Sequence, residues 1–557
     1  MLFSADLETT TNPNDCRVWA WALAEVGNPD NLMYGNSIDS LMEFCAGGKE
    51  NHVLYFHNLK FDGEFIIYWL FHHGYTHIAS SKKLSSKTFS TLISDRGVFY
   101  CMEICFELKD GKAKKLKIMD SLNVLPLSVD GIAKAFNLPI SKLKIDYDVY
   151  RPIGHKLTED EVSYIKNDVK IVALALQELF DRNLTKMTTG SNALNEYKNL
   201  IGKRQFKKLF PPPLYDNDIR QSYRGGFTYL NPIYKSKDIG RGIVLDVNSL
   251  YPSVMYYEPM PYGEGRYFEG EYKADKVYNL YIQMFRCQFK IKPNKIPTVQ
   301  LKNNLSFIPT EYIENSGEEY VTLCMTNVDL KLFFEQYEVF DLEYISGWKF
   351  KSVKDIFKDY IDKWNEIKVE ATKQGNASMR TIAKLMLNSL YGKFATNPRI
   401  QSKYPYLGDD DIIHYSLAPP EQREPVYIPI GTFITSYARN KTIRSAQLVY
   451  DRFIYADTDS LHLEGTDLPP ELEVSPTKLG AWKHESTFER ARFLRSKSYI
   501  EEIDGELKIT CAGMPSSCYD YVTWDNFKIG NSFPGKLKTT HTMGGIVLMD
   551  SPHTLRD

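Results

Sequence analysis

Residues 246–252 read DVNSLYP and follow the apolar run GIVL, so Asp246 stands at the end of a predicted strand. Residues 455–460 read YADTDS, which places Asp457 and Asp459 around a tight turn after a second apolar run. Burying several carboxylates close together costs free energy unless cations neutralise them. The two stretches together therefore predict a divalent-metal site on neighbouring strands, although YADTDS alone is also compatible with a solvated turn.

A pair of helices is predicted between these two stretches. IFKDYIDKWNEIK at 356–368 and RTIAKLMLNSLYGKF at 380–394 have helical periodicity and flank the polar loop KQGNASM. At about 100° per residue, one face of the second helix carries Arg380, Lys384, Asn388 and Tyr391. Simple solvent exposure would explain a polar helix face, but lysine, arginine and tyrosine together suit the phosphates and base of a nucleoside triphosphate.

A second set of acidic residues lies in the first part of the chain, where alternating strand and helix patterns predict an α/β domain. Asp6 and Glu8 stand two apart in a predicted strand and so point to one face. HNLKFDGEF supplies Asp62, and YIKND places Tyr164 and Asp168 on one face of a helix. Oxygen-rich sites of this kind hold Mg²⁺ or Mn²⁺, and two ions ~4 Å apart suit phosphodiester hydrolysis, with the tyrosine orienting the water. Taken alone, the first pair is more typical of a surface strand end.

The composition excludes some classes of protein. The 557 residues are 43% hydrophobic, enough for several cores, and the eight cysteines form no CxxC pair, as expected of reduced core residues. Neither secretion nor membrane insertion is expected, because the sequence shows no leader and no apolar run long enough to cross a bilayer. The net charge of −2 argues weakly against nucleic acid, but basic residues gather in KAKKLK at 112–117 and KNLIGKRQFKKLF at 198–210. Each basic run is as compatible with a solvated surface as with phosphate contact.

The acidic segments belong to a set of eight motifs that occur in one order along the chain. DLETT, HNLKFDGEF and YIKND come first, and DVNSLYP, KLMLNSLYG, TSYAR, YADTDS and KSY follow. This order resembles the family-B DNA polymerases, and long insertions on either side of the predicted helix pair resemble their protein-primed branch. Ala456 stands where the broader family usually has glycine, a change of little expected consequence.

The resemblance implies an α/β (α+β) multidomain fold, in which a ribonuclease H-like 3′–5′ exonuclease domain precedes a right-hand polymerase of palm, fingers and thumb with two protein-priming insertions. The second insertion has flanking prolines and two short apolar runs, so a protruding hairpin that closes a tunnel around DNA is expected, rather than a core element. The expected boundaries are 1–188 for the exonuclease domain, 189–257 and 426–512 for the palm, 258–354 for the first insertion, 355–396 for the fingers, 397–425 for the second insertion and 513–557 for the thumb.

The resemblance also implies roles for residues of the exonuclease domain. Metal binding falls to Asp6, Glu8, Asp62 and Asp168, with Tyr164 and Lys142 assisting catalysis. The residues expected to contact the single-stranded 3′ end are Thr9, His57, Asn58, Phe61, Phe65, Ser121 and Leu122.

In the polymerase part, Asp246, Val247 and Asp459 resemble metal ligands, and Asp457 resembles a supporting catalytic acid. Tyr251 resembles the residue that lies against the sugar and excludes a ribose 2′-hydroxyl. The nucleotide contacts implied are Val247, Tyr251, Arg380, Lys384, Asn388 and Tyr391. The DNA contacts implied are Thr435, Arg439, Lys497, Tyr499 and the YRGG segment of Tyr223, Arg224, Gly225 and Gly226, for which an ordinary glycine turn is the alternative.

The sequence thus predicts a DNA-directed DNA polymerase with a proofreading 3′–5′ exonuclease, protein-primed, processive and strand-displacing, that replicates a linear phage-type genome. The expected cofactors are two Mg²⁺ or Mn²⁺ ions per active site. The expected partners are template–primer DNA, deoxynucleoside triphosphates and a terminal protein, bound by a monomer in the cytoplasm of an infected bacterium, with no membrane. The alternatives are an exonuclease without polymerase activity and a nonenzymatic DNA-binding protein. An exonuclease without polymerase activity would have lost acids of the DVNSLYP and YADTDS site, where all are present. A nonenzymatic DNA-binding protein leaves the spaced acids unexplained.

Overall fold

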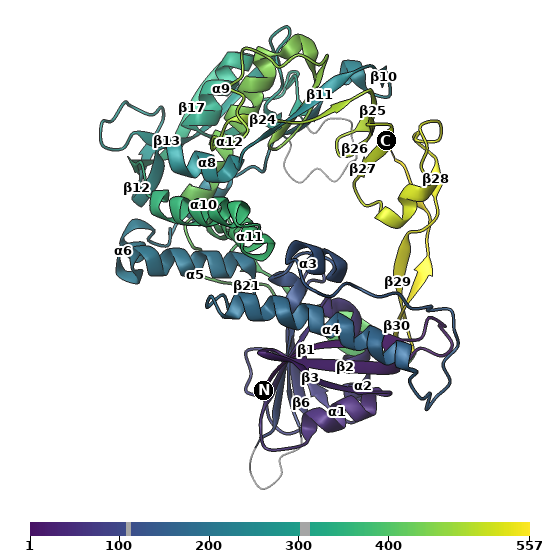
Figure 1. Cartoon of the computed structure of the whole chain (residues 1–557). Helices are drawn as coiled ribbons and strands as arrows, with labels where there is room; N and C mark the ends of the chain where they lie inside the picture. The colour runs from purple at the N-terminus through teal and green to yellow at the C-terminus, as the bar shows by residue number, and fades with distance from the viewer. Residues whose placement is uncertain (107–112, 301–311, 557) are drawn as a thin grey trace.

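Figure 1 shows the computed structural model of the chain, which describes residues 1–106, 113–300 and 312–556. One body at the bottom of the view holds the N-terminus, and a second at the top holds the central part of the chain. The C-terminal strands, in yellow, run from the second body back toward the first. Lys112 of the first basic run and residues 301–311 of the expected first insertion lie outside the described residues. No helix in the described part of the chain could cross a bilayer.

The N-terminal body is a mixed sheet with helices packed on it, which confirms the α/β domain predicted there. Its strands run in the order β6-β7-β8-β4-β1-β2-β3, with β1 parallel to β4 and antiparallel to β2. Helix α4 packs on β1 and β2, and a capping box of Thr158 and Glu161 fixes where it begins. The elements are β1 (Leu2–Thr9), β2 (Val18–Glu25), β3 (Asn28–Gly35), α1 (Ile38–Ala46), β4 (His52–Phe56), α2 (Leu59–His72), β5 (Thr76–His77), β6 (Thr88–Ser94), β7 (Phe99–Cys105), β8 (Lys115–Asp120), α3 (Val129–Ala135) and α4 (Glu159–Phe180).

The central body is built on a five-stranded antiparallel sheet in the order β24-β11-β23-β22-β9. Helix α12 lies against β22 and β23, and a second sheet of β10, β25, β26 and β27 shares a buried apolar cluster with the first. The elements are β9 (Thr228–Leu230), β10 (Asp238–Ile239), β11 (Gly242–Val247), α8 (Leu250–Tyr257), α12 (Ile428–Leu448), β22 (Phe453–Asp457), β23 (Ser460–Glu464), β24 (Trp482–Phe488), β25 (Arg490–Arg495), β26 (Ser498–Ile503) and β27 (Glu506–Cys511).

The segment expected as the first insertion forms its own four-stranded sheet in the order β12-β17-β13-β16, with α9 packed on it. The predicted pair of helices follows it as α10 and α11, which pack against each other. Ile382, Met386 and Leu390 of α11 are buried, whereas Lys384 and Asn388 are exposed, so the predicted polar face is confirmed. The elements are β12 (Met260–Glu269), β13 (Leu280–Ile291), β16 (Val321–Thr326), α9 (Asn327–Gln336), β17 (Tyr337–Val353), α10 (Lys358–Lys373) and α11 (Ala377–Phe394); helices α5 (Thr189–Ile201), α6 (Lys203–Leu209) and α7 (Asp216–Arg220) precede them.

The expected second insertion contains a hairpin, as predicted, but the hairpin does not stand free. Its strand β19 continues the N-terminal sheet, because Lys403 pairs with Ile93 of β6. Ile413 is only 2% exposed and belongs to the core of the N-terminal body, so the prediction of a protruding hairpin rather than a core element is wrong at this position. The elements are β18 (Arg399–Ile400), β19 (Ser402–Leu407), β20 (Ile413–Leu417) and β21 (Glu421–Gln422).

The C-terminal hairpin of β29 (Leu537–Thr542) and β30 (Gly545–Asp550) docks on helix α2 of the N-terminal body. Gly545 permits this approach, because a Cβ there would lie 2.6 Å from the Phe65 ring. Glu64 joins three parts of the chain: its Oε1 accepts a 2.8 Å hydrogen bond from Tyr415 of β20, and its Oε2 lies 3.7 Å from Nδ1 of His541. Burial raises the pKa of Glu64 to about 8. The second insertion, the C-terminal hairpin and the N-terminal body therefore meet at one side chain.

The cysteines are as predicted. All eight are free, and all but Cys101 are buried.

Candidate active sites

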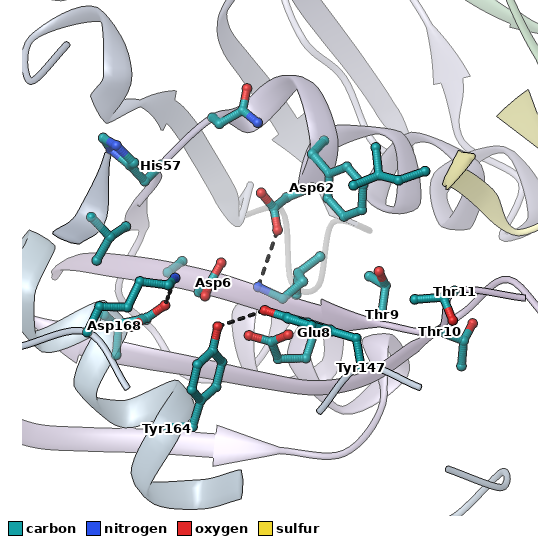
Figure 2. A pocket seen from close by; sticks show the side chains of 18 of the residues that line it. Asp6, Glu8, Thr9, Thr10, Thr11, His57, Asp62, Tyr147, Tyr164 and Asp168 are labelled. Carbon is teal, nitrogen blue, oxygen red and sulfur yellow. Dashed lines mark hydrogen bonds and ion pairs between the residues drawn. The ribbon is translucent and has the colours of Figure 1, made fainter. Parts of the chain in front are cut away.

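A cavity of about 670 Å³ opens beside strand β1 of the N-terminal body. Figure 2 shows acidic side chains converging on it from one strand and two helices. The cavity brings together ten of the residues predicted for this site, namely Asp6, Glu8, Thr9, His57, Asn58, Phe61, Asp62, Lys142, Tyr164 and Asp168.

Local structure places each acid. Asp6 and Glu8 alternate along β1 and therefore share a face of the sheet, as predicted. The backbone N–H of Leu7 donates a 3.2 Å hydrogen bond to Oδ1 of Asp62, which ties the first turn of α2 to this strand. Asp168 lies one turn after Tyr164 on α4, so both side chains reach the cavity.

The acids of this cavity repel one another, and burial further disfavours their charged forms. Burial and the neighbouring Asp168 carboxyl raise the pKa of Asp6 to about 7, and burial raises the pKa of Glu8 and of Asp62 well above the ordinary values. Oδ2 of Asp168 forms a 2.5 Å ion pair with Lys142, whereas its buried Oδ1 has no hydrogen-bond partner. Excess buried negative charge with a free carboxylate oxygen fits the binding of a hard divalent cation.

Three residues predicted to contact single-stranded DNA do not line this cavity. Phe65 is 2% exposed and packs under the C-terminal hairpin. Ser121 is fully buried, donates a 3.0 Å hydrogen bond to the carbonyl of Phe56 and lies 3.0 Å from His57 Nδ1. Leu122 is half-buried beside it. Ser121 and Phe65 therefore contact the residues His57 and Phe61 that do line the cavity.

The structure adds contributors that the sequence analysis missed. The hydroxyl of Tyr147 lies 2.7 Å from the hydroxyl of Tyr164, so two phenols stand at the cavity. Val547, Leu548 and Asp550 of the C-terminal hairpin line it as well, although they are about 380 residues from Tyr164 in the sequence. Nothing in their sequence marks them, because their position depends on the docking of a distant hairpin.

The second acidic cluster lies where three strands of the central sheet end. Asp246 pairs with Ser460 across β11 and β23, and the N–H of Val247 donates a 2.8 Å hydrogen bond to the carbonyl of Asp459. Thr458 has a φ of 58°, so it makes the tight turn that brings Asp457 and Asp459 together. The predicted convergence of DVNSLYP and YADTDS is therefore confirmed. The side chain of Val247 is buried, which leaves only its backbone to face a ligand.

A fourth acid, Glu485, belongs to this cluster and was missed. Burial and then the charges of Asp459 and Glu485 raise the pKa of Asp246 to about 7, while burial also raises the pKa of Asp459. Glu485 sits at a β-bulge in β24, since Val244 pairs with Ser486 and Leu245 with His484. A bulge changes the side of the sheet to which a side chain points, so the alternating pattern of the sequence does not predict it.

The polar face of α11 lies beside this cluster. The charge of Lys384 lowers the pKa of Asp246, which places the lysine within electrostatic reach of the acids. The ring of Tyr391 stacks on the ring of Tyr251 at 4.1 Å between centroids. Arg380 and Asn388 are exposed on the same face.

Asp457 is held by side chains from two other segments. Nζ of Lys497 lies 3.0 Å from its Oδ2, and the hydroxyl of Thr228 donates a 3.0 Å hydrogen bond to its Oδ1. Tyr499 lies in β26, two residues after Lys497, and its ring stacks on the Phe493 ring with 4.7 Å between centroids. The predicted KSY segment therefore does lie next to the acids.

Thr435 and Arg439 occupy positions different from those expected of direct DNA contacts. Thr435 is 1% exposed and Arg439 is 6% exposed. Nη1 of Arg439 donates 2.8 Å hydrogen bonds to the carbonyls of Arg224 and Gly225, and its Nη2 lies 2.5 Å from Asp329. Gly226 of the same YRGG segment packs on Thr458, where a Cβ would lie 2.5 Å from the threonine Oγ1. Arg439 thus holds YRGG against the acidic turn, and the glycine permits the close contact.

Comparison with known proteins agrees with this arrangement. The chain is 47% identical to a DNA polymerase of Bacillus phage M2 and 45% identical to that of Bacillus phage phi29, in each case over 100% of this chain and 99% of the relative. It is 32% identical to a DNA polymerase of Streptococcus phage Cp-1 over 100% of this chain and 98% of the relative.

A solved structure of phi29 DNA polymerase in complex with primer–template DNA and incoming nucleotide substrates matches the fold with a TM-score of 0.94, 44% identity and full coverage of both chains. The family described as DNA polymerase type B, organellar and viral, matches residues 46–154 and 150–476. Two acidic clusters, the polar face of α11 and this likeness over the full length lead to one conclusion: the chain belongs to the organellar and viral type B DNA polymerases.

Proposed function

We propose that this DNA polymerase extends primers at the central acidic cluster and removes mispaired 3′-terminal nucleotides at the N-terminal cavity. The observation that carries the proposal is that two clusters of acids, largely buried in the N-terminal cavity and half-buried in the central sheet, occur on separate bodies, each with a lysine beside it. The phi29 polymerase to which the chain is similar has been solved with primer–template DNA and also with single-stranded DNA. These are the DNA forms that the two activities use.

The donor sets fit two divalent cations, Mg²⁺ or Mn²⁺, at each centre. In the cavity Asp6, Glu8, Asp62 and Asp168 would hold them; in the central cluster Asp246, Asp459 and the backbone of Val247 would do so, with Asp457 in support. Such ions stabilise negative charge that develops on phosphate oxygens.

The side chains around the acids would orient the substrates. Lys384 and Arg380 carry positive charge toward the place where a triphosphate would lie, and Asn388 and Tyr391 present hydrogen-bonding and stacking groups. Lys497 and Tyr499 would hold the primer end beside Asp457. In the cavity, Tyr164 would orient the attacking water, and Lys142 would hold Asp168 in place.

We further propose that a monomer of this protein starts synthesis on a terminal protein, in the cytoplasm of an infected bacterium. The full-length likeness to polymerases of Bacillus and Streptococcus phages supports this proposal. The separate sheet of β12, β13, β16 and β17 offers the surface for such a partner.

The proposed pair of activities can be tested on one substrate. A labelled primer with a mispaired 3′ end, annealed to a longer template, should first lose its last nucleotide and then be extended, and a chelator should stop both steps. Extension without removal of the mispaired nucleotide would contradict the exonuclease, and removal without extension would contradict the polymerase site.

Tyr251 is predicted to exclude ribonucleotides. Its ring lies against Tyr391 beside Asp246, so Tyr251→Val should open space next to the sugar 2′ carbon. We expect ribonucleotide incorporation to rise about tenfold or more, the scale of ~1–3 kcal/mol of steric discrimination. Single-nucleotide kinetics with ribo- and deoxynucleotides measure the ratio. Tyr251→Phe keeps the ring and should behave as the parent; an unchanged ratio in the valine variant would show that the tyrosine only packs.

The second insertion is predicted to keep the enzyme on DNA and to part a downstream duplex. It bridges the fingers and the N-terminal body through the β19–β6 pairing and the hydrogen bond from Tyr415 to Glu64. Replacing residues 399–421 with a short Gly/Ser linker should leave the first few additions near normal. With a competitor trap, products on a long primed circle should be short, and synthesis should stop at a downstream duplex.

The deletion also removes Ile413 from the N-terminal core, so retained exonuclease activity must show that this body still folds. Tyr415→Phe is the milder companion, since it removes only the hydroxyl that donates a hydrogen bond to Glu64. Full-length strand-displaced products from the deletion variant would mean that the insertion is an ordinary surface element.

A further inference from the structure

The basic run KNLIGKRQFKKLF forms part of a larger positive surface that has no role in either active site. It lies on α5 and α6 and is joined by residues from the end of α11 and from the base of the second insertion. We call it the α5–α6 basic surface. It consists of Lys198, Lys203, Arg204, Lys207, Lys208, Lys393, Arg399 and Arg423, all exposed except Lys198 and Lys393, which are half-buried.

Contacts between the elements bring these cations together. The side chain of Lys393 packs on α5, where a Cβ at Gly190 would lie 3.0 Å from its Cδ. Nζ of Lys198 lies 4.6 Å from the ring centroid of Phe206 in α6. At the insertion base, the N–H of Arg423 donates a 2.8 Å hydrogen bond to the carbonyl of Pro398, next to Arg399.

The charges of this surface act on one another. Burial lowers the pKa of Lys393, and the nearby charges of Lys198 and Arg423 lower it further. Burial likewise lowers the pKa of Lys198; Glu424 opposes this effect, and Lys203 adds to it. Cations from three separate segments are therefore within electrostatic reach of one another.

Among the described residues, no carboxylate forms an ion pair with any of the eight cations. The neighbouring helix α10 is different, since Lys358 pairs with Asp362 and Lys363 pairs with Glu196. The whole chain has a net charge of −2, so this excess of positive charge is local. A cluster of unpaired Lys and Arg side chains drawn from several segments is the electrostatic feature expected where a polyanion binds.

The surface faces away from the polymerase acids. Lys384 and Lys393 are nine residues apart on α11, which at about 100° per residue puts them on opposite sides of the helix. Lys384 reaches Asp246, and Lys393 packs on α5. In Figure 1, α5 and α6 lie at the left edge of the molecule, across the space from the C-terminal strands. A polyanion bound there would lie apart from the polymerase acids.

We propose that the α5–α6 basic surface binds the phosphate backbone of the strand displaced during synthesis. The inference rests on the proposed strand displacement and adds a path for the unpaired strand. Since Arg399 and Arg423 stand at the base of the insertion that would part the duplex, a strand deflected there meets these cations next. Exposed Lys and Arg on a curved surface bind a single strand without reading its sequence.

The test removes three exposed charges with no partner in the described structure: Lys203→Ser, Lys207→Ser and Lys208→Ser together. The matched control removes three exposed lysines of the N-terminal body, Lys82→Ser, Lys83→Ser and Lys87→Ser, which have the same total charge. Both variants are measured on a bare primed single strand and on the same template blocked by a downstream duplex.

We expect the α6 variant to slow several-fold only through the duplex and the control to match the parent on both substrates. Equal slowing of the α6 variant on the two substrates would mean that the surface takes the template strand, which would overturn the proposal. Equal rates of the α6 variant and the control variant through the duplex would overturn it as well.

A binding measurement separates this inference from the proposed strand displacement. The probe is a forked DNA whose unpaired 5′ flap carries a photoreactive thymidine. The flap should cross-link to α6 in the parent, and the slope of log affinity against log salt should fall by about two in the α6 variant, for three lost single-strand phosphate contacts. An unchanged slope and an unchanged cross-link would overturn the proposal even if the parent displaces strands well. The cross-link would support it even if the parent stalled at the duplex.

Discussion

Replacing Asp459 with alanine is expected to reduce nucleotide addition by about a thousandfold or more, a barrier increase of ~4 kcal/mol, while exonuclease activity and DNA binding are retained. Asp459 and Asp246 are half-buried neighbours, with the exposed Glu485 close by, so removing Asp459 takes away a carboxylate on which the proposed metal site depends. Asp246→Ala should have the same effect. Single-turnover primer extension measures the loss.

The stability of these variants should not fall. Because burial and repulsion raise the pKa of Asp246 to about 7, its ionised form is disfavoured in the folded state, and its removal relieves that cost. Thermal unfolding at neutral pH should show an unchanged or higher midpoint. Asp451→Ala is the control, an exposed aspartate just before the same hairpin. Extension within tenfold of the parent in either active-site variant would show that the metal assignment is wrong.

Local pattern was sufficient to predict the acidic strands and the helix pair. The alternation of side chains along β1 predicted that Asp6 and Glu8 share one face of the strand, and the spacing of four predicted that Tyr164 and Asp168 share one face of α4. Both predictions succeed because these periodicities are properties of the backbone alone. The resemblance then supplied the division into exonuclease and polymerase parts, which the residues by themselves do not specify.

The features that were missed depend on contacts between distant segments. Glu485 reaches the cluster through a bulge, and Leu548 reaches the N-terminal cavity because a hairpin docks on α2. Arg439 was expected on DNA, but its guanidinium is buried against Asp329, a residue of α9. Burial of a charged group depends on which partner the tertiary fold supplies, and that partner is more than a hundred residues away.

The exonuclease should be lost without loss of synthesis when Asp6→Ala and Asp62→Ala are combined. Asp62 is anchored by the N–H of Leu7, next to Asp6, so the two carboxyls lie on adjoining elements of one cavity. We expect digestion of a labelled 3′ single strand to fall by about a thousandfold or more. Primer extension should stay within about twofold, since the polymerase acids lie on a different body.

The same argument from pKa predicts that this double variant folds at least as well as the parent. Burial raises the pKa of Asp6 and Asp62, so at neutral pH the folded state carries a cost that alanine removes. Asp95→Ala changes an exposed aspartate of the same body and should alter neither activity. The decisive comparison is a mispaired primer end, which the double variant should extend without first removing it. Equal loss of digestion and of extension would show that the two acidic clusters do not act independently.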